Sequence, residues 1–450
     1  MIDFEKELMF NKIIFSILTL ILFTTPLIFS QTNSPPDTLL HNATLENCVE
    51  YALKNQPLIK QSLIDENIAN QEIKSKLADW YPQLNFNFNY QHNYKLQTSV
   101  IQGNTVRFGV INTSSAQFSL NQTIFDRDVL LASSTAGDVR KQAEQSTTEN
   151  KIDVVVSVSK AFYAALLAQN QIDLVNEDIT RLTQSEKDTY NQYKSGVVDK
   201  TDYMRATVAL NNAKAEQNQD KEMLKTSYAY LKQQMGYPTN EKLKLNYDTT
   251  EMEEDILIDT TNTIDFNNRI EFQLLKTEKR LQEANLDYYE WSFIPSLSAF
   301  GEYNFNFFND KLSQLYKQDY PTAYVGLQLS FPIFEGGKRF QQIEQAKLEL
   351  KRYNYDFESL KNSINTEYVQ ALSNYKSNLE NFLTQRKNLS LAKEVYNTIE
   401  FQYKSGVKAY LDVITAETDL RTTQVNYINA LYQVLSSKLD LQKALGKIQY

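Results

Sequence analysis

QYKSGV occurs twice in this chain of 450 residues, at Gln192 to Val197 and again at Gln402 to Val407. The copy extends beyond the six letters, because nine of the nineteen positions from Gln192 to Leu210 are identical to those from Gln402 to Leu420. Upstream, the segment from Asn55 to Leu84 aligns without a gap to the segment from Asn268 to Leu297. Self-similarity of this kind indicates a tandem duplication.

Each repeat has the pattern of a helix, a strand, a loop, a strand, a very long helix, a break and a return helix. Repeat 1 is predicted at residues 31–262 and repeat 2 at residues 263–450. In repeat 1 we expect strands at about 82–95 and 114–125, a tip turn at about 192–202 and an equatorial segment at about 236–262. In repeat 2 we expect strands at about 295–307 and 322–334 and a tip turn at about 402–412.

The strand predictions rest on alternation. Leu84, Phe86, Phe88 and Tyr90 are separated by polar residues, so one face of the strand is apolar and the other polar. The polar segments 91–113 and 308–321 are expected to be exposed loops. A two-faced strand suits a membrane barrel with lipid outside and water inside. Since four strands cannot close a barrel and open edges are costly in lipid, several copies must pool their strands.

The long helices are predicted from two stretches without glycine or proline. Residues 138–195 and 338–405 contain neither glycine nor proline, and each helix would extend for roughly 90 to 100 Å at 1.5 Å per residue. Gly196 and Gly406 are then the glycines that end them. Asp202 and Asp412 follow near the start of the return helices, where a carboxylate is favoured. An alternative interpretation is that both aspartates only cap their helices.

The first residues have the pattern of an export signal. Lys12 precedes an apolar stretch that ends near Ser30, so residues 1–30 are predicted to be a signal peptide, with a retained membrane anchor as the alternative. No later segment offers an apolar run of spanning-helix length, so we expect no crossing of the inner membrane. Export, barrel strands and long helices together indicate a tube that starts in an outer membrane and extends into the periplasm.

Charge and composition exclude other classes. The formal net charge of −9 argues against nucleic acid as a partner. Two histidines and one cysteine, without a glycine-rich loop after a strand, provide no zinc cluster, nucleophile triad or phosphate cradle. We therefore expect neither an enzyme nor a cofactor. The fold class predicted is mainly α with a small membrane β-barrel.

The sequence resembles the TolC-like outer-membrane efflux proteins over essentially the whole mature chain. The resemblance rests on TLENCVEYALKNQP (Thr44 to Pro57), on the proline-led strands and on a glycine followed six residues later by aspartate, in duplicate, as in GVKAYLDVITAETDL (Gly406 to Leu420). It implies a homotrimer with a twelve-strand barrel in the outer membrane of a Gram-negative bacterium, continued by a periplasmic α-helical barrel. A trimer needs the tip motif twice in each chain, because its periplasmic end has six tips.

The resemblance also implies a function and partners. The duct is passive and expels small molecules. A periplasmic adaptor docks at the tips, and an inner-membrane transporter of the resistance-nodulation-division, ABC or major-facilitator type supplies the energy. The same duct serves type I protein secretion, which stays open as an alternative. A periplasmic coiled-coil scaffold without a pore is the third hypothesis.

The resemblance assigns roles to single positions. Asp412 matches an aspartate that lines the channel constriction, and Thr415 stands where some members have a second aspartate, which weakens the charge there. Asp202, Tyr403 and Lys408 match positions whose polar links hold the tips shut. The expected adaptor-docking residues are Ser195, Gly196, Val197, Ser405, Gly406 and Val407.

Overall fold

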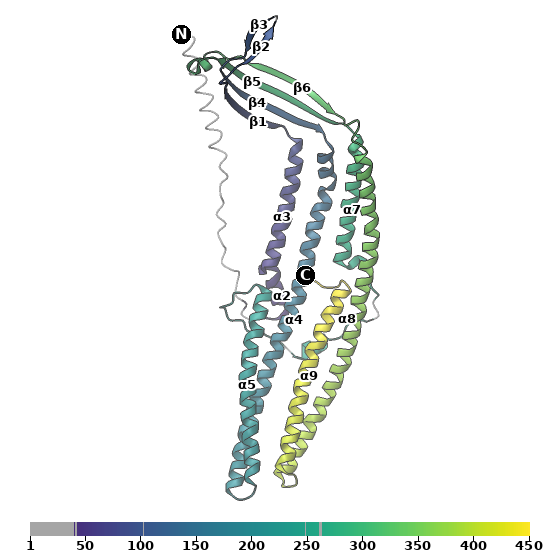
Figure 1. Ribbon diagram of the computed structural model, residues 1–450. Helices are drawn as coiled ribbons and strands as arrows, with labels where there is room; N and C mark the ends of the chain where they lie inside the picture. Colours follow the sequence, from purple (N-terminus) through teal and green to yellow (C-terminus); the bar gives the residue numbers. More distant parts are fainter. Residues whose placement is uncertain (1–39, 41–42, 102, 248, 261–262) are drawn as a thin grey trace. The chain divides into compact units, whose positions relative to one another are not determined.

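The computed structural model describes residues 40, 43–101, 103–247, 249–260 and 263–450 (Figure 1). The segment predicted to be a signal peptide, residues 1–30, lies outside the described residues. The chain divides into the units Met1–Leu40 and His41–Tyr450, and the architecture below is that of the second unit.

Four antiparallel strands form the main sheet in the order β1-β4-β5-β6. The central pair, β4 and β5, comes from different repeats, so the sheet joins the two halves of the duplication. Among the described residues, no strand pairs with the outer side of β1 or of β6. The bounds are β1 Gln83–His92, β4 Asn112–Phe125, β5 Ser296–Asn309 and β6 Thr322–Ser330.

The register of the sheet separates apolar from polar side chains. Phe86 lies opposite Phe118, which lies opposite Tyr303 on the next strand, and the rings of Phe86 and Phe118 are 4.9 Å apart. The neighbouring row contains polar side chains, with Asn85 opposite Ser119 and Ser119 opposite Glu302. The apolar side chains are exposed in the single chain, Phe86 to 57%. This is the two-faced sheet that the alternation predicted.

The loops between the strands are more structured than expected. Residues 91–113 contain a hairpin of β2, Gln97–Ile101, and β3, Asn104–Phe108. The prediction of a plain loop was wrong because each strand has only five residues, which is too short for alternation to identify a strand. Residues 308–321 contain the short 3-10 helix η4, Leu312–Lys317.

Eight α-helices are present in the described part of the chain. The longest, α4 with 68 residues and α8 with 67, each span about 100 Å. Helix α4 begins earlier than expected and continues through Gly137, because the Asp126 side chain caps it by accepting from the Asp128 N–H at 2.8 Å. The bounds are α2 Leu45–Asn55, α3 Pro57–Leu77, α4 Arg127–Lys194, α5 Lys200–Met235, α6 Thr249–Glu254, α7 Ile270–Glu290, α8 Lys338–Lys404 and α9 Tyr410–Ala444.

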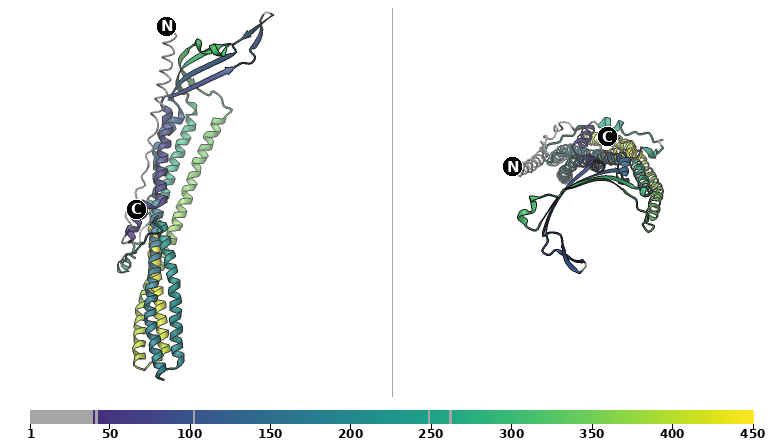
Figure 2. Two further views of the ribbon diagram at one scale, coloured as in Figure 1. Left: turned by 90° about the vertical axis from the view of Figure 1, so that its left-hand side faces the viewer. Right: turned by 90° about the horizontal axis from the view of Figure 1, so that it is seen from above.

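The long helices fold back on themselves as two hairpins, α4–α5 and α8–α9, which lie side by side through α4 and α9 (Figures 1 and 2). Nearer the sheet, α4 packs against α3 and α7, and α7 packs against α8. Helix α4 thus contacts a helix on each side along its length. Helix α3 lies at one side of the array and α8 at the other.

Helix α4 differs from expectation in its hydropathy. An 18-residue window of it has a mean hydropathy of 1.4, which by length and composition alone would suit a membrane span. Within this window 61% of the residues are buried inside the chain. Val155, Ala161 and Phe162 are among the buried residues of this helix. The apolar run is therefore explained by the core of the helical array.

The duplication is visible in how the return helices end. Gly236 follows α5 and Gly446 follows α9, both with φ of +66°. A Cβ on Gly236 would lie 2.9 Å from the carbonyl oxygen of Asn55, and one on Gly446 would lie 2.7 Å from that of Asn268. Each return helix thus ends against the backbone just before the helix that leads to the first strand of its own repeat, α3 in repeat 1 and α7 in repeat 2.

Candidate functional site at the hairpin tips

The two QYKSGV segments form the same turn. A serine is the C-cap of each long helix, and it is followed by Gly196 with φ of +73° or by Gly406 with φ of +77°. The N–H of Val197 donates to the Gln192 carbonyl oxygen at 2.9 Å, and the N–H of Val407 donates to that of Gln402 at 2.9 Å. This bond pattern satisfies the last carbonyl groups of a helix and needs a left-handed residue, which glycine supplies.

The turns are exposed. Val197 is 72% and Val407 73% exposed, so the two tips present nearly the same apolar side chain to solvent. The remaining predicted docking residues are exposed as well: Ser195, Gly196, Ser405 and Gly406.

The two return helices are capped by different residues. In the first tip the Asp199 side chain accepts from the Thr201 N–H at 2.8 Å and from its hydroxyl at 2.9 Å. These bonds lower the pKa of Asp199. Asp202 lies three residues further on, in the first turn of α5. For this tip the N-cap is therefore Asp199, a residue that the sequence reasoning did not select although an aspartate before a helix is a strong start signal.

In the second tip the N-cap position is Ala409, which has no side-chain acceptor. Asp412 instead accepts from the Ala409 N–H at 3.2 Å, and its carboxylate lies 3.9 Å from Lys408 Nζ. The predicted constriction residue thus also caps its helix. The exposed Thr415 donates its hydroxyl to the Leu411 carbonyl at 2.9 Å.

The predicted link residue Tyr403 joins the two tips. Its hydroxyl donates to Gln192 Oε1 at 3.0 Å, so the tyrosine of the second QYKSGV bonds the glutamine of the first. Burial raises the pKa of Tyr403, and the carboxylates of Asp202 and Asp188 raise it further. Tyr403 therefore stays protonated and able to donate.

A second bond between the hairpins lies beside the first. The hydroxyls of Tyr410 and Ser185 are 2.6 Å apart, and the rings of Tyr403 and Tyr410 are 5.8 Å apart. Sequence reasoning missed Gln192, Ser185 and Tyr410. Gln192 could have been found, since it belongs to the repeated string, whereas Ser185 has no distinguishing local signal.

Asp202 acts on Tyr403 through its charge, which raises the pKa of Tyr403, and Lys408 lies beside Asp412. Within the described residues no group of three acidic, histidine or cysteine side chains could hold a metal ion.

Comparisons with known proteins show the family of the chain. A family model described as outer membrane efflux protein matches residues 48–237 and 268–447. The outer membrane protein TolC of Vibrio cholerae serotype O1 is 20% identical over 404 residues, which cover 88% of this chain and 89% of the relative. The proteases secretion protein PrtF of Dickeya chrysanthemi is 21% identical over 413 residues, which cover 89% of this chain and 87% of the relative.

Among solved structures, CusC shares the fold with a TM-score of 0.72 and 16% identity, covering 93% of this chain and 95% of that one. The family match divides into two segments, as the internal duplication does. With its two-faced sheet, its paired hairpins and this match over most of its length, the chain belongs to the outer membrane efflux protein family.

Proposed function

We propose that the chain is the outer-membrane exit duct of a tripartite efflux system, a passive channel that expels small molecules through a water-filled interior. The observation that carries this proposal is the continuity between the sheet and the helices. A sheet with one apolar and one polar face leads directly into α4 and α8, each about 100 Å long. Such helices extend far beyond the hydrocarbon thickness of a bilayer.

The open edges of the sheet support a homotrimer. β1 follows α3 and β6 precedes α8, so one side of the chain presents α3 and β1, and the other presents β6 and α8. A copy that pairs its β1 with β6 of the next would bring α3 beside α8, and three copies would close a ring of twelve strands. Closure removes the edges that are too costly to leave open in lipid.

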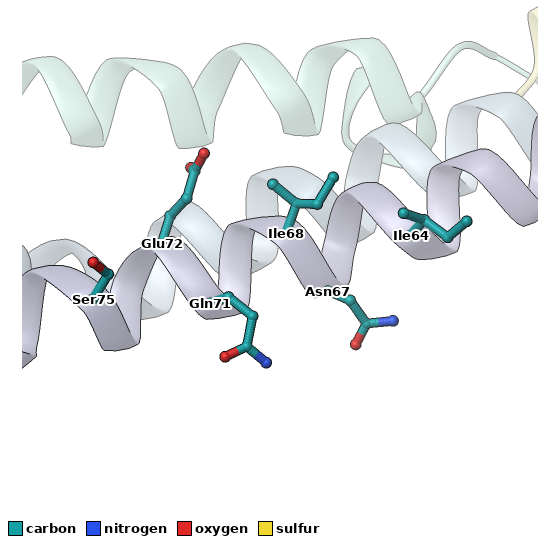
Figure 3. A pocket seen from close by; sticks show the side chains of 6 residues that line it. All are labelled: Ile64, Asn67, Ile68, Gln71, Glu72 and Ser75. Carbon is teal, nitrogen blue, oxygen red and sulfur yellow. The ribbon is translucent and has the colours of Figure 1, made fainter. Parts of the chain in front are cut away.

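A shallow groove on α3 supports the same contact (Figure 3). Ile64 and Ile68 are exposed one turn apart on this helix. On α8 the exposed apolar side chains include Phe340 and Leu348. We expect the groove to receive α8 of the neighbouring copy. The groove is lined by Ile64, Asn67, Ile68, Gln71, Glu72 and Ser75. Native mass spectrometry in detergent should give three chains, and Ile68→Glu should lower that fraction.

The six tips of a trimer would form the periplasmic end, where an adaptor protein of an inner-membrane transporter docks. The exposed Val197 and Val407 would supply its apolar contacts. Three copies of Asp412 would form a carboxylate ring at the constriction, with Thr415 one turn further along the helix. Tyr403, Asp202 and Lys408 would hold the tips in the closed state, in which Lys408 also reduces the negative charge beside Asp412.

Conductance in a planar bilayer tests the duct. We expect a small, cation-selective conductance whose selectivity falls in Asp412→Asn. Asparagine keeps an oxygen for the Ala409 N–H, so this change removes the charge and retains the cap. The control is Glu222→Gln, which removes an exposed carboxylate of α5. No conductance from wild type or from Tyr403→Phe would favour a scaffold without a pore, and unchanged selectivity would reduce Asp412 to a cap.

Protein export is the second candidate function, because one relative is a proteases secretion protein. A deletion strain distinguishes the two kinds of cargo. Increased sensitivity to small toxic molecules with normal secreted proteins would support efflux, whereas loss of secreted proteins alone would support secretion.

A further inference from the structure

Five charged side chains meet where α4, α5 and α9 pack together. Asp178 and Arg181 come from α4, Glu216 from α5, and Glu417 and Arg421 from α9. We propose that this charge cluster is the pivot about which the α8–α9 hairpin moves relative to α4–α5 when the tips open, with Arg421 as the positioning residue. The inference rests on the proposed function, because it assigns the place of a motion that a duct needs.

The two arginines are each shared between two carboxylates. Arg421 Nε lies 2.9 Å from Asp178 Oδ2, and Arg421 also pairs with Glu216. Arg181 pairs with Asp178 of its own helix, and the Nε atom of Arg181 lies 3.3 Å from Glu417 Oε1. Arg421 is therefore a side chain of α9 that contacts both helices of the other hairpin.

The cluster is poorly suited to a purely stabilising role. The side chain of Asp178 is only 2% exposed and that of Glu417 only 12%. Burial raises the pKa of both carboxyl groups in spite of the neighbouring arginines. Apolar residues of similar volume often stabilise such a site as well or better, while buried ion pairs can fix the register of packed elements. The network thus defines a relative position of α9 and α4 at a cost in desolvation.

The packing around the cluster differs between the α4–α5 interface and the α4–α9 interface. Within the α4–α5 hairpin, Leu182 packs with Leu210 and Ala213 in a buried apolar group. Across the interface from α4 to α9, Arg421 pairs with Asp178 and Arg181 pairs with Glu417. The apolar group holds α4 and α5 together within one hairpin. The ion pairs link α4 to α9 of the other hairpin, and each pair can be broken separately.

The links between the hairpins also change along their length. On the sheet side of the cluster, Lys160 pairs with Asp440 at 2.5 Å and Asp153 with Lys443 at 2.7 Å, and Asn170 donates to the Tyr432 hydroxyl at 2.7 Å. On the tip side the links described above are neutral hydrogen bonds, from Tyr403 to Gln192 and between Ser185 and Tyr410. The sixteen residues from Asp178 to Lys194 place the cluster about 24 Å from the end of α4. Most of the buried residues of α4 and α9 lie on the sheet side of the cluster, among them Phe162, Leu166, Leu431 and Leu435, and few lie between the cluster and the tips. The tip segment is therefore held by less buried apolar surface than the segment on the sheet side.

Distances between spin labels test the pivot. One pair of labels, the tip pair, would be placed at Ser195→Cys and Ser405→Cys. The upper pair would be placed on the sheet side of the cluster, at Ala164→Cys and Gln433→Cys. All four positions are exposed. The buried Cys48 is replaced by alanine in every sample. Labelled chains are diluted with unlabelled chains, so that an assembly contains one labelled copy.

Arg421→Met should broaden the distance distribution at the tips and leave the upper pair unchanged. Arg421→Lys, which keeps the charge but cannot use two separate N–H groups of a planar fork, should give an intermediate width. Lys225→Met is the control, because it removes an exposed ion pair of α5. Conductance should increase several-fold in Arg421→Met.

Equal broadening of both pairs would overturn the proposal, because the cluster would then only hold the hairpins together. No broadening at the tips, or a wild-type width in Arg421→Lys, would overturn it too. If none of the variants conducts, the proposed function fails, and the two distances still decide whether the cluster is a pivot.

Discussion

Gly446 and Gly406 have nearly the same backbone conformation in very different surroundings. Alanine at each position therefore separates the strain of a left-handed backbone from the steric clash of an added Cβ. Their φ angles are +66° and +77°. A Cβ added to Gly406 would meet no atom within 4 Å. One added to Gly446 would lie 2.7 Å from the carbonyl oxygen of Asn268 and 2.9 Å from its carbonyl carbon.

The expected magnitudes follow from these contacts. A left-handed conformation costs a residue with a Cβ about 1–2 kcal/mol, and Gly406→Ala should lose this amount alone. Gly446→Ala adds a clash with backbone atoms, which cannot move aside as a flexible side chain can. Overpacking of this kind costs about 1–3 kcal/mol, so the total for Gly446→Ala should be about 2–5 kcal/mol.

Urea unfolding followed by circular dichroism at 222 nm measures both variants, in one detergent and at one protein concentration. Gly236→Ala serves as a second member of the crowded class, because its Cβ would meet Asn55 and Gln56 at 2.9 Å. Equal destabilisation by Gly446→Ala and Gly406→Ala would refute the reasoning, since it would mean that the contact of α9 with Asn268 does not constrain the chain.

Tyr403→Phe removes the bond to Gln192, worth about 0.5–1.5 kcal/mol, so single-channel recordings should show a larger open probability than for wild type. Glu417 has a raised pKa in the folded chain, so folding binds a proton there more tightly. The stability contributed by this site should therefore grow as the pH falls through the raised pKa of the folded chain toward 4.5, the ordinary pKa of a glutamate. Glu417→Gln removes this titration and should flatten the pH dependence of the urea midpoint between neutral and mildly acidic solution. Arg269→Met leaves Glu271 and Glu367 without their buried partner and two carbonyl groups of α9 without a donor. It should lower the unfolding free energy by about 3–5 kcal/mol, against less than about 1 kcal/mol for the exposed Arg352→Met.

Three outcomes would contradict these expectations. An unchanged open probability in Tyr403→Phe would show that the bond to Gln192 does not hold the tips. A pH dependence equal to that of wild type in Glu417→Gln would place the titrating groups elsewhere. Arg269→Met and Arg352→Met with the same midpoint in thermal unfolding would show that the burial of Arg269 has no energetic consequence.

The sequence by itself determined the elements that depend on local signals. Alternation from Leu84 to Tyr90 indicated a two-faced strand, and β1 extends from Gln83 to His92 with Phe86 opposite Phe118 and Asn85 opposite Ser119. The absence of glycine and proline from 138–195 and 338–405 indicated the long helices, and Gly196 and Gly406 indicated where they end. These features need no knowledge of distant residues, because each depends on the conformational preferences of a few consecutive positions.

The tertiary structure decided which residues meet. It placed β4 beside β5, joined Gln192 to Tyr403, and made Asp199 rather than Asp202 the cap of α5. Asp178 and Arg421 are separated by more than two hundred residues and belong to different hairpins. No local sequence pattern distinguishes either residue from the other charged residues on the exposed faces of the helices. Only the packing of α4 against α9 buries them together, and burial is what gives their charges a consequence.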